Sequence, residues 1–170
     1  SVSGFNNLGV VAMMQDNPSL AVQSFTRGAE ITPRASTFSN LGTVHFWNGR
    51  FAEARTAYEQ AIALNPADAS LHRNLGDAFQ GLKDIDRARG AYRKALDLAE
   101  SQRKVNPRDA STLSLVAVLE AKQGNRAPAR ARADEALALA PKDAEVYYRS
   151  AVVAALAGDP ARALDDFTAA

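Results

Sequence analysis

Residues 35–68 read ASTFSNLGTVHFWNGRFAEARTAYEQAIALNPAD, and this stretch decides the fold of the chain. Apolar residues recur at helical spacing on both sides of a turn at Asn48-Gly49. Gly42 and Ala54 are small where two helices must approach closely, and Tyr58 and Phe38 are large where a gap needs filling. Pro66 stops the second helix because proline disfavours helical backbone in the residue before it. The stretch therefore predicts a hairpin of two helices.

The same pattern recurs along the chain. The small residue at Gly42 has counterparts about 34 residues apart, with one interval seven residues longer, at Gly9, Gly76, Ala117 and Ala151. These positions divide the chain into five repeats, at about 2–34, 35–68, 69–109, 110–143 and 144–170. One hairpin cannot bury its apolar face alone, so we expect each repeat to stack on its neighbours.

This order of small, aromatic and proline positions resembles the tetratricopeptide (TPR) helix–turn–helix repeat, and the resemblance covers the whole chain. It implies an all-α fold, a right-handed α-solenoid of five hairpins forming a single domain over 1–170. The seven extra residues of the third repeat predict a second helix longer by about 10 Å, with a tip at 100–108 that projects from its neighbours. Because the pattern starts at Ser1 and stops at Ala170 within a helix, we expect a fragment of a longer protein.

Composition excludes several classes of function. The formal net charge is +1, so the chain carries no overall field that would attract a nucleic acid or an anionic membrane. There is no cysteine for disulfides or thiolate metal sites. No apolar run reaches the roughly 20 residues that span a bilayer. We expect a cytoplasmic protein with neither nucleic acid nor membrane as a partner.

No catalytic constellation is present in the sequence. The two histidines, His45 and His72, stand at repeat positions that usually hold an aromatic core residue, and we expect them to pack in the core. Neither belongs to a zinc-binding motif, and no phosphate-binding loop occurs. The sequence thus predicts a protein that is not an enzyme and has no metal or other cofactor.

The resemblance to TPR proteins implies that the first helix of each repeat lines a concave groove. Three repeats place asparagine at the same position of this helix, at Asn7, Asn40 and Asn74. An amide donates and accepts, so it matches one peptide unit of an extended chain. The three side chains are therefore candidates for a ladder that binds a peptide backbone. The alternative is that they contact the adjacent helix.

Specificity would come from the residues that flank this row. By the same resemblance, the candidate peptide-binding side chains include Met13, Phe46, Trp47, Arg73, Asp77, Tyr148 and Arg149. The Met and aromatic members suit adaptable apolar contacts, unless some of them pack between helices. The two arginines could bind an acidic side chain or a terminal carboxylate. The spacing of Lys and Asn that chaperone-tail-binding TPR domains use is missing.

The expected function is a non-catalytic protein–protein interaction scaffold that binds an extended or helical peptide segment in its groove. The alternative is a regulatory or self-association module attached to a signalling enzyme or a transcription regulator, forming a homodimer through uncapped ends. The lengthened third repeat is similar to TPR tails of bacterial serine/threonine kinases and winged-helix regulators, which implies a bacterial source.

Overall fold

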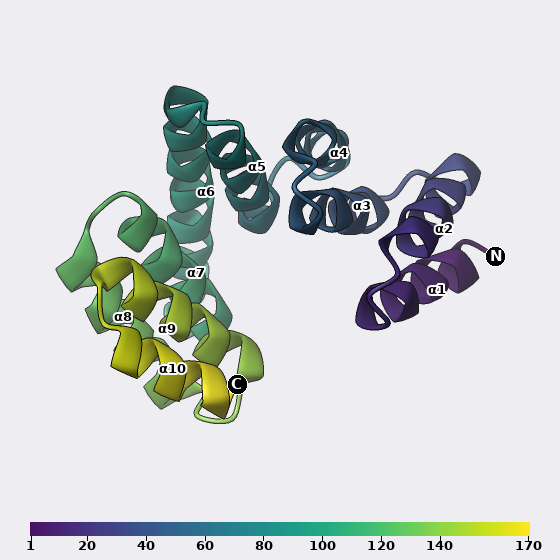
Figure 1. Ribbon diagram of the computed structural model, residues 1–170. Coiled ribbons are helices and arrows are strands. Elements are labelled where there is room, and N and C mark those ends of the chain that lie inside the picture. Colours follow the sequence, from purple (N-terminus) through teal and green to yellow (C-terminus); the bar gives the residue numbers. More distant parts are fainter. The chain divides into compact units, whose positions relative to one another are not determined.

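The computed structural model describes residues 1–170, apart from the side chain of Val2. The described chain forms ten α-helices and no strand, which confirms the all-α prediction (Figure 1). Their bounds are α1 Val2–Met14, α2 Pro18–Ile31, α3 Ala35–Trp47, α4 Phe51–Leu64, α5 Ala69–Gly81, α6 Ile85–Val105, α7 Ala110–Lys122, α8 Arg126–Leu139, α9 Ala144–Ala157 and α10 Pro160–Ala169.

One backbone conformation recurs in the turn inside each hairpin. Its central residue has a positive φ in all five repeats: 52° at Asp16, 70° at Gly49, 61° at Lys83, 87° at Gly124 and 82° at Gly158. Glycine adopts this left-handed conformation without a steric cost because it has no Cβ. The aspartate and the lysine are the exceptions, and they carry a backbone penalty that the glycines avoid.

Aspartates start the first helix of three repeats. The side chains of Asp68, Asp109 and Asp143 accept hydrogen bonds from the backbone N–H two residues further on, at 2.8, 3.2 and 2.9 Å. Such caps satisfy backbone donors that have no partner within the helix.

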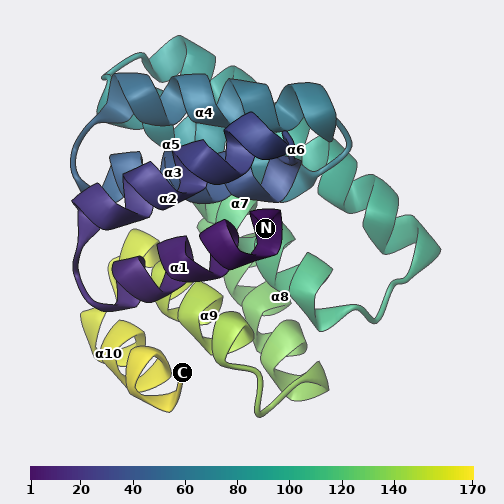
Figure 2. The same cartoon turned by 90° about the vertical axis from the view of Figure 1, so that its right-hand side faces the viewer.

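The described chain divides into two compact units at a boundary inside α6. Unit 1 is Ser1–Ala91 and unit 2 is Tyr92–Ala170. Within unit 1, α1 packs on α2 and α3 on α4 (Figure 1). Within unit 2, α7 packs on α8 and α9 on α10, as the second view also shows (Figure 2). The single continuous domain that the repeats predict stays a prediction.

The core of unit 1 is built from contacts between successive hairpins. Val44 of α3 is buried against Ala12, Ala21 and Phe25 of the first hairpin. One repeat later, Ala78 of α5 packs in the same way against the hairpin of α3 and α4. These contacts repeat because the tenth residue of a repeat meets the hairpin before it. The sequence period is therefore also the period of the core.

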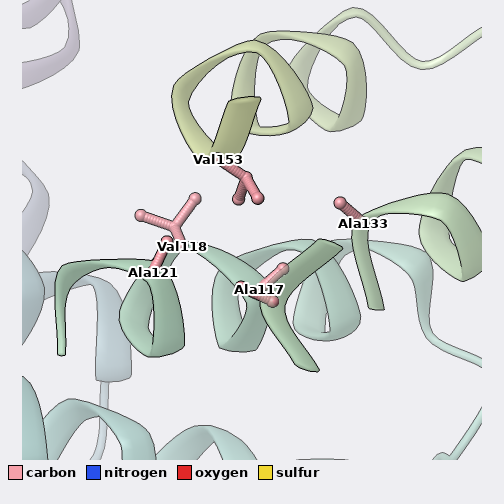
Figure 3. Close-up of a cluster of buried hydrophobic side chains, with 6 residues drawn as sticks. Ala117, Val118, Ala121, Ala133 and Val153 are labelled. Atoms are coloured by element: carbon pink, nitrogen blue, oxygen red, sulfur yellow. The ribbon is translucent and has the colours of Figure 1, made fainter. Parts of the chain in front are cut away.

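Unit 2 repeats this contact with smaller side chains. Val153 of α9 lies over the α7–α8 hairpin, in a cluster with Val118 and Ala133 (Figure 3). Alanines at 117, 121 and 129 complete the cluster, and their small size lets the helices approach closely. Within α7, every residue from Thr112 to Ala121 is buried.

The lengthened second helix of the third repeat is confirmed, because α6 is 21 residues long. Near its end, Glu100 accepts a hydrogen bond from Arg103 at 2.7 Å and lies 3.4 Å from Arg132 of α8. Arg132 also pairs with Glu120 of α7 at 2.9 Å. Burial raises the pKa of the Glu120 carboxyl, and the Arg132 guanidinium opposes this. Arg103 and Arg132 thus both have acidic partners in this part of unit 2.

Candidate functional site

The three asparagines of the predicted row all belong to unit 1. Asn7 lies on α1, Asn40 on α3 and Asn74 on α5, each at the sixth residue of its repeat. Asn7 is exposed, and the other two are half-buried. The three helices are the first helices of successive hairpins, so the row repeats one position of the fold three times.

The hydrogen bonds of these amides differ. The described part of the chain offers no partner to the side chains of Asn7 and Asn40, whereas Asn74 Oδ1 accepts a hydrogen bond from Arg73 at 2.7 Å. The contact between first helices is made instead by Asn6, which exchanges hydrogen bonds with Thr37 at 2.9 and 3.1 Å. The side-chain amides of Asn7 and Asn40 are therefore left without a hydrogen bond inside the described chain.

Arg73 and Asp77 surround the end of a buried tyrosine. The Tyr58 hydroxyl lies 3.2 Å from Thr43 Oγ1. Burial raises the pKa of Tyr58, with Asp77 adding to the rise and Arg73 opposing it. Arg73 also donates a hydrogen bond to Asn74, so two of the predicted site residues contact each other in the middle of α5.

Met13 and Trp47 of the predicted apolar patch line one notch in unit 1. Trp47 is 70% exposed, and Met13 packs partly on the core below. Phe46 points elsewhere: it packs toward Tyr58 and meets the Phe51 ring edge-on at 5.4 Å between centroids. The alternative reading, packing between helices, therefore applies to Phe46.

The notch contains one charged residue that the repeat pattern had not marked as a site, Asp16. Asp16 belongs to the turn between α1 and α2, whereas Val44 and Trp47 of the notch belong to α3. A signal was available in the sequence, because Asp16 stands where three of the five turns have glycine.

The remaining two candidates lie on α9 of unit 2. Tyr148 is 49% exposed. Arg149 is buried, and its guanidinium donates to the Ser111 carbonyl at 2.7 Å and to Ser114 Oγ at 3.1 Å. Glu145 pairs with its other terminal nitrogen. The structure thus uses Arg149 to join α9 to α7 instead of presenting it at the surface.

The two histidines have different surroundings. His45 is 7% exposed, as expected for a core side chain, and its Nδ1 has no hydrogen-bond partner in the described chain. His72 is only half-buried, because its ring reaches back to the Pro66 carbonyl at 2.9 Å from Nε2. The expectation of a core position is therefore wrong for His72.

His45 should make the stability of the protein depend on pH. Burial lowers the pKa of its imidazole below 6.5, Arg50 lowers it further and Glu53 opposes them. The unfolded chain thus binds a proton more readily, and stability is lost as pH falls through 6.5. We expect His45→Phe to reduce the loss between pH 7.5 and 5.5, measured by urea unfolding of both proteins. An identical loss in the variant would contradict this.

Apolar side chains are also exposed at the first and last helices. Val11 of α1 is 46% exposed, whereas its counterpart Val44 is buried against the hairpin before it. On α10, Leu164 and Phe167 are 63% and 61% exposed. The predicted homodimer through such faces stays a prediction.

Models of the tetratricopeptide repeat match residues 33–101, 67–142 and 117–170. The chain belongs to the tetratricopeptide repeat family. TPR proteins generally mediate protein–protein interaction or assembly and act as non-catalytic scaffolds, so a protein partner is the general expectation for this chain. None of its described helices has the length and apolar character to cross a membrane.

Relatives with known names match parts of this TPR chain. Heat shock protein STI1 of Saccharomyces cerevisiae is 31% identical over 85 residues, which cover 49% of this chain and 14% of that protein. Photosystem I assembly protein Ycf3 of Rippkaea orientalis is 34% identical over 108 residues, covering 62% and 58%. The chain therefore spans only part of the length of these relatives.

A solved structure has the same fold. The thermophilic TPR protein TTC0263 of Thermus thermophilus superposes with a TM-score of 0.71 and is 22% identical, covering 99% of this chain and 89% of that one. At this level of identity the likeness establishes the fold of the TPR chain.

Proposed function

We propose that unit 1 of this TPR chain binds an extended or helical segment of a partner protein along α1, α3 and α5. The observation that supports this most directly is the row of Asn7, Asn40 and Asn74. Two of these amides have no hydrogen-bond partner in the described chain, and the third uses only its oxygen. A polypeptide backbone carries a donor and an acceptor in every residue, so it fits such a row.

The grip of the row is weak for each contact and tolerant of sequence. A hydrogen bond of this kind contributes about 0.5–1.5 kcal/mol net, because both groups give up water when they pair. Three bonds therefore add up to about 1.5–4.5 kcal/mol, which sets the register of a bound segment without selecting its side chains. Exposed side chains beside the row, above all Trp47, would provide the selection.

Replacing Asn7, Asn40 and Asn74 together by alanine should remove binding while the chain stays folded. Replacing Asn7 and Asn40 removes no hydrogen bond inside the described chain, and replacing Asn74 removes only the one from Arg73, which is half-buried. The measurement is quantitative capture of partner proteins by the immobilised chain, compared by mass spectrometry, with circular dichroism to check folding. We expect the bound amount of specific partners to fall by about tenfold or more.

A matched control removes the same number of amides outside the row. Asn65, Asn106 and Asn125 are exposed asparagines at turns beyond the ends of helices. Their triple alanine variant should capture the partners as the unmodified chain does. Equal capture by the row variant and by this control would refute the ladder.

A further inference from the structure

The notch beside Trp47 has a cavity volume of about 90 Å³, and every residue that lines it lies in unit 1. It is formed where the turn between α1 and α2 meets the last turn of α3, by Met13, Asp16, Asn17, Pro18, Val44, Trp47 and Asn48. This volume is below the range typical of small-molecule sites, so the notch suits one side chain of a partner better than a whole ligand.

The walls of the notch are apolar or already hydrogen-bonded. The Asn17 side chain accepts from Leu20 N at 3.1 Å, and Asn48 Nδ2 donates to the Val44 carbonyl at 2.7 Å. Each amide thus caps its own backbone. Trp47 contributes an aromatic ring that is 70% exposed.

Asp16 is the only charged residue among the described residues that line the notch. Its carboxylate is exposed and has no salt bridge or hydrogen bond to another described side chain. Arg50, which follows α3 in the chain, is already paired with Glu53 at 2.8 Å. The notch therefore combines a negative charge with an aromatic surface. The Asp16 carboxylate forms no ion pair with another residue of the described chain.

Asp16 has a backbone conformation that favours glycine. Its φ of 52° belongs to the conformation that glycine adopts in three of the other four turns. Aspartate tolerates the left-handed region better than most residues, but at a cost that glycine avoids. Lys83, with a φ of 61°, bears the same cost in the third repeat and is not among the residues that line this notch. Asp16 and Lys83 thus have the same backbone conformation, and only Asp16 lines this notch.

We propose that the notch binds an arginine side chain of the partner segment. The aliphatic stem lies against Met13 and the flat guanidinium stacks on Trp47, while its N–H groups donate to the Asp16 carboxylate. Arginine fits better than lysine because its guanidinium is planar, stacks on aromatic rings and donates through several N–H groups in one plane. This inference rests on the proposed function and adds the chemistry of the partner: a basic residue beside the segment held by the asparagine row.

The only tryptophan of the chain is Trp47, so all tryptophan fluorescence of the folded chain comes from this notch. The probe is a capped pentapeptide, glycine-leucine-arginine-leucine-glycine, titrated into the whole 170-residue chain. A second peptide carries citrulline in place of the arginine, which keeps the size and removes the charge. A third carries lysine. We expect the arginine peptide to change the Trp47 emission with the lowest dissociation constant, and this difference to shrink as salt is added.

Three variants locate the interaction. Asp16→Asn keeps the size of the side chain and removes its charge, and Asp16→Gly also relieves the left-handed backbone. Both should weaken binding of the arginine peptide by about tenfold or more, the effect of losing one charge-assisted contact. Asp16→Gly should unfold at the same temperature as the unmodified chain or higher, so a binding loss there is not a folding defect. Lys83→Gly, the matched control, should share any gain in stability and bind normally.

The proposal is overturned by any of three results: no change in Trp47 emission up to about 5 mM arginine peptide, equal binding of the citrulline peptide, or unchanged binding by Asp16→Asn. These results do not bear on the asparagine row, because the triple variant of the row is tested separately, by capture of partner proteins. If the row variant captures partners normally while binding of the arginine peptide still requires Asp16, the arginine-binding notch is supported and the asparagine ladder is refuted.

Discussion

Tyr58→Ala should lower the free energy of unfolding of unit 1 by about 3–5 kcal/mol, the loss typical of a buried aromatic residue. Tyr58 is 3% exposed and fills the space between Gly42 of α3 and Ala78 of α5. Deleting the ring leaves a cavity at the contact between two successive hairpins, and Thr43 loses its hydroxyl partner. Since each repeat is stabilised by its neighbours, the damage should spread to both hairpins.

The opposite change at the same contact should also destabilise the unit. A Cβ at Gly42 would lie 2.6 Å from Tyr58 Cε1, which is closer than two non-bonded carbon atoms can approach. We expect Gly42→Ala to cost about 1–3 kcal/mol through overpacking, although alanine is the better helix former. Combining it with Tyr58→Leu, which removes the clashing part of the ring, should cost less than the sum of the single changes.

Urea unfolding followed by circular dichroism and by Trp47 fluorescence measures these effects, because Trp47 lies in unit 1. A natural control is Gly90, where an added Cβ meets nothing within 4 Å. Gly90→Ala should leave stability unchanged or raise it. If Gly42→Ala behaved like Gly90→Ala, or if the double variant showed strictly additive losses, the close contact of Gly42 and Tyr58 would be refuted.

Arg149→Ala should destabilise unit 2 by about 2–4 kcal/mol, because it removes buried volume and several hydrogen bonds at once. The Arg149 side chain is 7% exposed and reaches from α9 to the start of α7. Without it, the Ser111 carbonyl loses its charged donor, and Glu145 loses its ion pair. Glu145 is mostly exposed, so water can take over its solvation, and the loss falls mainly on the contact between α7 and α9.

Two further substitutions separate packing from hydrogen bonding. Arg149→Met keeps most of the apolar stem and removes the donors, whereas Arg149→Lys keeps the charge without the planar fork that reaches Ser111 and Ser114 together. Both should lie between the unmodified chain and Arg149→Ala in urea unfolding. Amide hydrogen exchange should show the loss in α7 and α9. Full stability of Arg149→Met would mean that the hydrogen bonds contribute nothing net.

The fold was predictable because its determinants are local. Glycine or a tolerant residue at the turn, aspartate at a helix start and small residues at close approaches act over a few neighbouring residues. Gly49, Asp68 and Gly42 could each be assigned from the sequence. The contacts between hairpins are also predictable, because Val44 and Val153 occupy the same position of different repeats. The extra length of α6 follows equally directly from the delayed proline.

The candidate site was predictable only in part. The asparagine row follows from the period, and the structure brings Met13 and Trp47 of the predicted patch to one notch. The direction of a single side chain does not follow from the period. Phe46 and Trp47 are adjacent in sequence, yet one packs on the core and the other is exposed, because neighbouring residues of a helix point about 100° apart.

The sequence by itself determined the ten helices, their turns and the stacking of each hairpin on the one before it, since these depend on side chains at fixed offsets along the chain. Only the tertiary structure decided how individual polar groups are used. It buried Arg149 between α7 and α9, linked Glu100 to Arg132, and placed Asp16 beside Trp47. Those pairs come from different helices or turns, and their partners depend on how the helices meet in space, which the repeat pattern does not encode for any one polar residue.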